Sequence, residues 1–217
     1  MFTNLNFSFI KKYWTYYMAG LWMTLKLAFW SLIFGTVLGI ILGMMRLSKN
    51  KVISKATAAW ITFVRGVPVM VTILIIYYGI ATNLPAFWAA VVAMTVNSSV
   101  YISEHVRAGV QAVNKGQMEA ARCIGMSALQ ANWYIIIPQA IKNILPSLCN
   151  EFILLIKNTS VVSTIALHEL TYNSNIVRTN TFLAFEPLLV TAVIYFTVTF
   201  ILNQLVRLLE VRLRAHD

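Results

Sequence analysis

Residues Leu27 to Met45 read LAFWSLIFGTVLGIILGMM, a run without a charged side chain. A helix needs about 20 mostly apolar residues to cross the hydrocarbon of a bilayer. The run therefore predicts a membrane-spanning helix, which we extend back to near Met18. No small-residue cleavage site follows this long run, so we expect a retained span and not a removed signal peptide.

The composition of the whole chain agrees with burial in lipid. Of the 217 residues, 59% are hydrophobic and 11% are charged, whereas soluble domains carry about 25% charged residues. So few charges cannot cover a water-facing surface, which argues against a freestanding soluble enzyme and against disorder. Cys123 and Cys149 are too few for a disulfide framework.

Four further apolar runs follow, separated by more polar stretches. We predict an all-α membrane protein that forms a single domain, 1–217, with five transmembrane helices at about 18–46, 56–82, 86–110, 146–167 and 187–208. The stretch 113–132 is expected to be a loop that carries a short helix. The polar stretch 171–180 is expected to lie outside the hydrocarbon.

Basic residues decide the predicted orientation, because Lys and Arg are enriched in cytoplasmic segments. With a cytoplasmic C-terminus, the inside segments hold ten of them, namely Arg46, Lys49, Lys51, Lys55, Arg107, Lys115, Arg122, Arg207, Arg212 and Arg214. The outside segments hold three, namely Lys11, Lys12 and Arg178. We therefore place the N-terminus outside. The net charge of +10 is read as a topology signal and as contact with lipid headgroups, and not as nucleic-acid binding.

The loop between the third and fourth predicted spans holds the most distinctive pattern. It reads GQMEAARCIG from Gly116 to Gly125, then nine residues, then IIIP from Ile135 to Pro138. This resembles the EAA motif of ABC importer permeases, which is Glu-Ala-Ala, three residues, Gly, nine residues and Ile-x-Leu-Pro. The matching residues are Glu119, Ala120, Ala121 and Gly125, and Ile137 stands at the usual Leu.

Other segments resemble the polar amino-acid subfamily of these permeases. The stretch FVRGVP from Phe63 to Pro68 is similar to its Phe-Arg-Gly-Thr-Pro sequence. Further similar segments are Tyr77-Tyr78-Gly79, Asn97 to Arg107, Lys115-Gly116-Gln117 and Lys157-Asn158-Thr159-Ser160. The resemblance covers roughly Leu21 to Leu208.

The resemblance implies the permease subunit of an ATP-driven importer of polar amino acids, a multi-pass protein of the bacterial plasma membrane. It implies that Gly116 and the helix Glu119–Gly125 couple the chain to a separate ATPase. The other implied partners are a second permease, identical or homologous, an extracellular solute-binding protein and the amino-acid substrate. Two ATPase subunits per complex would hold ATP and magnesium.

The residues themselves leave two readings of this short helix. An Ala-rich helix with Glu119 near its N-terminal part is favoured by helix propensity and by the helix dipole. Gly125 is expected to end the turn and to permit close approach of another backbone. The alternative is a solvated loop helix with no partner.

We expect no catalytic residue, metal or cofactor in this chain. It has no G-x-x-x-x-G-K-[ST] phosphate loop and no nucleophile elbow. His105, His168 and His216 are scattered, without the spacing of metal ligands.

Two polar clusters fall near the middle of the third and fourth predicted spans. Ionisable residues at this depth are costly and are candidates for function. The predicted substrate path comprises Asn97, Tyr101, Glu104, Lys157, Asn158, Thr159 and Ser160. Lys157 would hold the substrate carboxylate, and Glu104 its ammonium or a basic side chain. The alternative is that Lys157 pairs with Glu104 or Glu151 and only holds helices together.

Three more features carry expectations. Gly35, Gly39 and Gly43 form a small-residue stripe, which predicts close helix packing. Arg65 is expected to reach the headgroups or to cap carbonyls. His168-Glu169 could contact the delivering protein, close an outer gate or form a solvated helix end.

Two other classes of protein compete with the importer. An ion-coupled secondary transporter would act without an ATPase, but it predicts internal repeats that the five runs do not show. A membrane-embedded enzyme or scaffold is the third class, and no convergent catalytic set supports an enzyme.

Overall fold

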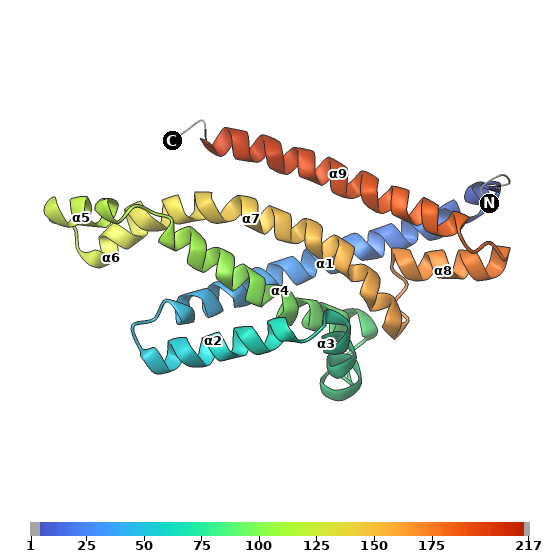
Figure 1. Ribbon diagram of the computed structural model, residues 1–217, viewed down its shortest axis with the longest axis horizontal. Coiled ribbons are helices and arrows are strands. Elements are labelled where there is room, and N and C mark those ends of the chain that lie inside the picture. Colours follow the sequence, from blue (N-terminus) through green and yellow to red (C-terminus); the bar gives the residue numbers. More distant parts are fainter. Residues whose placement is uncertain (1–4, 215–217) are drawn as a thin grey trace. The chain divides into compact units, whose positions relative to one another are not determined.

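Helices make up all the regular structure in residues 5–214, which are the residues that the computed structural model describes. The α-helices, in chain order, are α1 (Phe9–Arg46), α2 (Lys51–Gly66), α3 (Val69–Ile75), α4 (Ala86–Gln111), α5 (Lys115–Cys123), α6 (Ala128–Ala131), α7 (Ile137–Asn158), α8 (Leu170–Thr181) and α9 (Glu186–Arg214) (Figure 1). Two π-helical turns, η1 (Ile76–Ile80) and η2 (Asn132–Ile136), and a 3₁₀ helix, η3 (Thr159–Ile165), adjoin them. The prediction of an all-helical chain is confirmed over these residues.

The long helices are apolar enough to cross a membrane. Within the described residues, α1, α4 and α9 each meet the length and hydropathy of a span. Two pairs of helices, each bent at a short break, raise this number to as many as five. A membrane protein with several apolar helices is therefore confirmed.

The second predicted span is interrupted where Pro68 separates α2 from α3. Val67 is extended, with φ −95° and ψ 129°, because the proline ring clashes with a helical residue before it. Proline also has no N–H for the helix to use. The apolar composition of 56–82 is continuous, so hydropathy alone predicts one helix where the backbone forms two.

The fourth apolar run, 146–167, begins inside α7 and continues through η3. α7 begins at Ile137 and contains Pro146 in its interior. The polar stretch that follows this run is also helical, as α8, although the sequence predicted only that it lies outside the hydrocarbon. His216 and the side chain of Arg214 lie outside the described residues.

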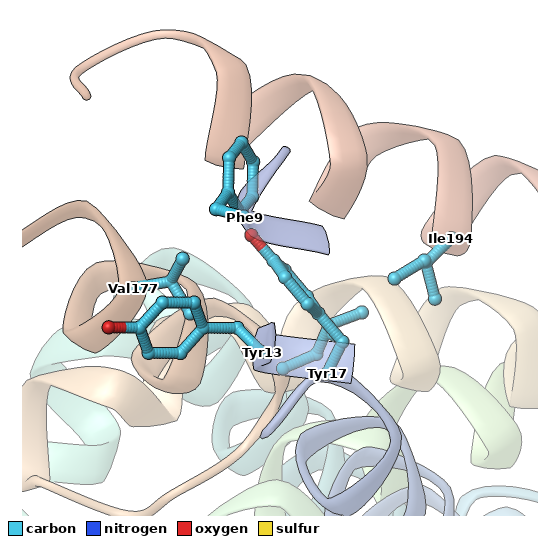
Figure 2. Close-up of a cluster of buried hydrophobic side chains, with 6 residues drawn as sticks. Phe9, Tyr13, Tyr17, Val177 and Ile194 are labelled. Carbon is cyan, nitrogen blue, oxygen red and sulfur yellow. The ribbon is translucent and has the colours of Figure 1, made fainter. Parts of the chain in front are cut away.

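The chain divides into two compact units. The first unit comprises the described residues 5–32, 68–94 and 152–204, and its core gathers side chains from α1, α8 and α9 (Figure 2). Phe9, Tyr13 and Tyr17 follow each other at helical spacing along α1 and meet Val177 and Ile194. The Tyr17 hydroxyl also donates to the Pro187 carbonyl at 3.3 Å, which fixes the beginning of α9.

The second unit comprises 33–67, 95–151 and the described part of 205–217. Its glycine stripe confirms the predicted packing face, because Gly35, Gly39 and Gly43 lie against α4. A Cβ atom at Gly39 would fall 2.6 Å from Cγ2 of Ile102, closer than side-chain atoms approach each other. The helices reach this spacing because these positions carry no side chain.

We therefore expect Gly39→Ala to destabilise the second unit. The added methyl overpacks the contact with Ile102, and overpacking costs about 1–3 kcal/mol. The unfolding temperature of the purified chain in detergent should fall. Gly79→Ala is the matched control, because a Cβ at Gly79 meets no atom within 4 Å. Equal unfolding temperatures for the two variants would contradict the packing argument.

Candidate functional site

The EAA-like motif folds as the short helix α5, capped at its beginning by Asn114. The Asn114 side chain accepts a hydrogen bond from the backbone N–H of Gly116 at 2.8 Å, which satisfies a donor that the helix leaves unpaired. Glu119 is the fifth of the nine helical residues, and the first turn holds no acidic residue. The expectation that Glu119 lies near the N-terminal end was therefore wrong, because the cap begins the helix earlier.

Gly125 ends this segment as predicted. Its φ is +87°, a left-handed conformation that glycine adopts without a steric penalty. The turn is closed by backbone bonds from Gly125 to Arg122 and from Met126 to Ala121, both 3.1 Å long. A Cβ at Gly125 would meet no described atom within 4 Å, so any close approach here would have to come from another molecule.

A second short helix, α6, follows and lies beside α5 (Figure 1). It begins with a capping box in which Ser127 and Gln130 each bond the other's backbone N–H. Ala121 and Ala131 are buried, so α5 and α6 each turn an alanine away from solvent.

Around this buried pair, four large apolar side chains face outward. Ile124 and Leu129 are each 78% exposed, and Trp133 and Tyr134 are also exposed. We call Ile124, Gly125, Leu129, Trp133 and Tyr134 the docking surface. Exposed apolar patches of this kind mark sites of protein interaction. Sequence reasoning found Gly125 but missed the four apolar residues, because hydropathy does not distinguish an outward side chain from a buried one.

The predicted substrate-path residues of α4 lie in the second unit. Asn97 is buried, Tyr101 is partly exposed and Glu104 is half-buried. Glu104 forms an ion pair with Arg107, whose terminal nitrogen lies 2.7 Å from its Oε2. The other carboxylate considered as a helix-pairing partner, Glu151, lies 3.9 Å from Nε2 of His105. Each carboxylate thus faces a basic side chain within its own unit.

Arg65 contacts this group in a way that the sequence did not indicate. Its guanidinium lies 5.5 Å from the centre of the Tyr101 ring, within the range of a cation–π interaction. Arg65 comes from the last turn of α2, so it brings a positive charge to the exposed ring of a predicted substrate-path residue. The charge of Arg65 inside an apolar run was the sequence signal of this contact. From the sequence alone, that charge was interpreted as a contact with headgroups or as a cap on carbonyls.

The other substrate-path residues lie in the first unit, where α7 gives way to η3. Lys157 is exposed, whereas Thr159 is fully buried. Thr159 and Ser160 donate their hydroxyl protons to the carbonyls of Ile156 and Lys157 at 2.7 and 2.8 Å. Such bonds compete with the helix and accompany the change to 3₁₀ geometry. The hydroxyl oxygen of Ser160, which is partly exposed, remains able to accept a hydrogen bond from a ligand.

Glu169 differs from the expected solvated helix end. It is fully buried and caps α8 by accepting the backbone N–H groups of Thr171 and Tyr172 at 2.9 and 2.7 Å. The Tyr195 hydroxyl of α9 donates to the same carboxylate at 3.0 Å. The carboxylate therefore ties α8 to α9 and is not open to a partner, whereas His168 is exposed and lies against the Tyr172 ring.

No group of three or more His, Cys, Asp or Glu side chains in the described part of the chain is placed to hold a metal ion. The candidate features are an outward apolar surface at α5 and α6, polar groups on α4 in the second unit, and polar groups at the end of α7 in the first unit.

Comparison with known proteins identifies the class to which these features belong. A family model described as "Binding-protein-dependent transport system inner membrane component" matches residues 35–215. The chain is 35% identical over 212 residues to the probable glutamine ABC transporter permease protein GlnM of Bacillus subtilis (strain 168), covering 96% of this chain and 98% of that protein. It is 33% identical over 218 residues to the arginine transport system permease protein ArtQ of the same strain, covering 99% and 100%.

A solved structure agrees with these sequences. The fold matches one chain of the crystal structure of an amino acid ABC transporter with histidines, with a TM-score of 0.90, 42% identity and coverage of 97% of this chain and 100% of that one. The apolar helices and the EAA-like motif of this chain are thus those of a transporter permease. The chain belongs to the family of binding-protein-dependent transport system inner membrane components, among the ABC permeases of the amino-acid importer type.

Proposed function

We propose that this chain is the membrane-spanning subunit of an ATP-driven importer of polar amino acids, and that α5 and α6 connect it to a separate ATPase. The docking surface is the observation that carries this proposal. Ile124 is 78% exposed just after α5, a helix that carries Lys115, Glu119 and Arg122 and lies in no candidate span of the described residues, and a Cβ at Gly125 would meet open space. A groove on a partner protein would cover the apolar side chains of this surface, and their removal from water would favour binding.

The proposed complex holds two ATPase subunits, a second permease that is identical or homologous, and an extracellular solute-binding protein. ATP and magnesium belong to the ATPase, and this chain needs no cofactor. The relatives named for glutamine and arginine support a polar amino acid as the substrate. We place the complex in the bacterial plasma membrane.

The native thiol of Cys123 gives a direct test of the docking assignment. Cys123 is exposed at the end of α5, next to the docking surface. In a Cys149→Ser background, a short bifunctional reagent is expected to cross-link Cys123 to the ATPase subunit in the purified complex. The matched control, Cys123→Ser, retains Cys149 on α7 and should give no such product. Cross-linking of Cys149 alone, or of neither thiol, would contradict the assignment.

The orientation of the chain is part of the proposal, with the N-terminus outside and α5 in the cytoplasm. Lys115 and Asn180 are both exposed and lie on opposite sides in this arrangement. Single cysteines at these positions, in a Cys123→Ser/Cys149→Ser background, can be treated on intact cells with an impermeant maleimide. We expect labelling at 180 and protection at 115. The reverse pattern would invert the orientation.

A further inference from the structure

An apolar groove of about 590 Å³ runs between α1 and α9 in the first unit. Ile10, Trp14 and Met18 line it from α1, and Val190, Val193 and Ile194 line it from α9. Trp14 is 48% and Val193 is 62% exposed, so the groove opens to the outside of the chain. Ile194 belongs both to this lining and to the core cluster of Figure 2. The shape and composition suit a hydrocarbon chain.

A positive charge lies beside the α1 side of this groove. Lys11 precedes the lining residue Trp14 by three positions within α1, so the two side chains are neighbours on the helix surface, at the edge of the face that lines the groove. Its side chain is exposed and forms no ion pair with another described residue. The nearby carboxylate of Glu186 is buried and accepts the backbone N–H of Asn6 at 3.2 Å.

Trp14 adds a hydrogen-bond donor beside this charge. An indole ring with one apolar body and one N–H group suits the boundary between acyl chains and headgroups. Lys12, the next lysine, points about 100° further around the helix, and its Nζ lies 5.2 Å from the centre of the Tyr13 ring. Lys11 is therefore the lysine of this pair that lies nearer to the groove.

We propose that this groove is a binding site for an anionic phospholipid, with an acyl chain between α1 and α9 and the phosphate at Lys11 and Trp14. A zwitterionic lipid brings an ammonium group that competes with Lys11, whereas an anionic lipid leaves its phosphate to the lysine. The site should therefore prefer phosphatidylglycerol to phosphatidylcholine.

Fluorescence quenching of Trp14 measures this preference in the assembled complex. Trp14 is left as the only tryptophan of the chain by replacing with phenylalanine Trp22, Trp30, Trp60, Trp88 and Trp133. The complex is placed in bilayers that contain either brominated phosphatidylglycerol or brominated phosphatidylcholine. We expect about fivefold stronger apparent binding of the anionic lipid, the contribution of one lysine near a lipid headgroup.

Matched variants separate the site from general surface charge. Lys11→Ala should abolish the preference and Lys12→Ala should keep it, whereas Val193→Phe should fill the groove and reduce quenching by both lipids. Equal quenching by both lipids in the parent, or equal effects of the two lysine variants, would overturn the proposal. Absence of quenching by either lipid would overturn it as well and would indicate that a second protein chain covers the groove.

A second measurement avoids the multiple tryptophan changes. If the single-tryptophan chain does not assemble, native mass spectrometry of the complex can compare bound phosphatidylglycerol in Lys11→Ala and Lys12→Ala on the otherwise unaltered chain. Loss of bound lipid in Lys11→Ala alone supports the site. Equal retention in the two variants contradicts it.

Discussion

Gly125→Asp is expected to lower ATP-driven uptake at least about tenfold, since an unpaired charge buried in an interface costs several kcal/mol. Gly125 belongs to the docking surface, with open space where a Cβ would be. Its φ of +87° disfavours most side chains, but aspartate and asparagine tolerate left-handed conformations best. The turn should therefore persist while the surface acquires a charge. Substrate-stimulated ATP hydrolysis should fall together with uptake.

Gly125→Asn is the matched control for this experiment. It places a side chain of the same size in the same backbone conformation without the charge, so the difference between the two variants isolates electrostatics from shape. Membrane insertion and yield should match the parent for both. Full uptake by Gly125→Asp would remove α5 and its turn from the ATPase contact.

Lys157→Ala should raise the amino-acid concentration needed for half-maximal uptake by about ten- to hundredfold, because a hydrogen bond to a charged group contributes about 1.5–3 kcal/mol. Lys157 is exposed at the end of α7, where the helix tightens into η3. We propose, as the sequence led us to expect, that its ammonium holds the carboxylate that every amino acid carries. Assembly with the ATPase should not change.

Lys26→Ala is the control for that substitution. Lys26 is also an exposed lysine on an apolar helix, and it lies over the ring of Trp22 at 5.2 Å. Its loss should leave the concentration dependence of uptake unaltered. A fall in yield for Lys157→Ala, with unchanged concentration dependence, would show that Lys157 supports the helices and does not contact substrate.

The predicted role of Glu104 in the substrate path is constrained by a contact that the sequence did not reveal. Its carboxylate is engaged by Arg107 at 2.7 Å, so an incoming ammonium would have to share or displace that guanidinium. Glu104→Gln keeps the shape and removes the charge, and it should affect uptake of basic amino acids more than that of neutral ones if the carboxylate meets the substrate.

The apolar runs predicted the long helices well because length and hydropathy are sufficient for a helix in lipid. The run after Leu27 became α1, and the glycine stripe at Gly35, Gly39 and Gly43 found its packing face. Both features depend on local sequence: the helix on its apolar composition, and the packing face on the spacing of its glycines. The helix at the EAA-like motif was equally accessible, since a resemblance placed it and an asparagine cap begins it.

The features that the sequence did not reveal depend on contacts between distant residues. For His168-Glu169 three roles were left open, namely contact with the delivering protein, closure of an outer gate and a solvated helix end. The Glu169 carboxylate is fully buried, and it accepts a hydrogen bond from Tyr195, which lies 26 residues further along the chain. Arg65 was expected to reach the headgroups or to cap carbonyls, and its contact with the Tyr101 ring was not foreseen. Neither partner can be found from spacing within one helix, because the fold brings them together only after the helices have packed.

The docking surface shows the same limit at the candidate site. Ile124 and Leu129 lie in the stretch that was expected to be a loop with a short helix, and nothing in the sequence indicated that each is 78% exposed. Their direction is set by the capping box of α6 and by the left-handed turn at Gly125, which together decide which side chains face outward. Sequence predicted one residue of the surface, Gly125, and only the folded backbone revealed its extent.

Uptake into proteoliposomes tests the central claim most directly. The chain is reconstituted with its proposed ATPase, and a labelled polar amino acid is supplied with binding protein on the side opposite α5. We predict uptake that requires ATP on the α5 side and persists when ion gradients are abolished. Uptake driven by a sodium or proton gradient by the chain without an ATPase would contradict the account and favour a secondary transporter.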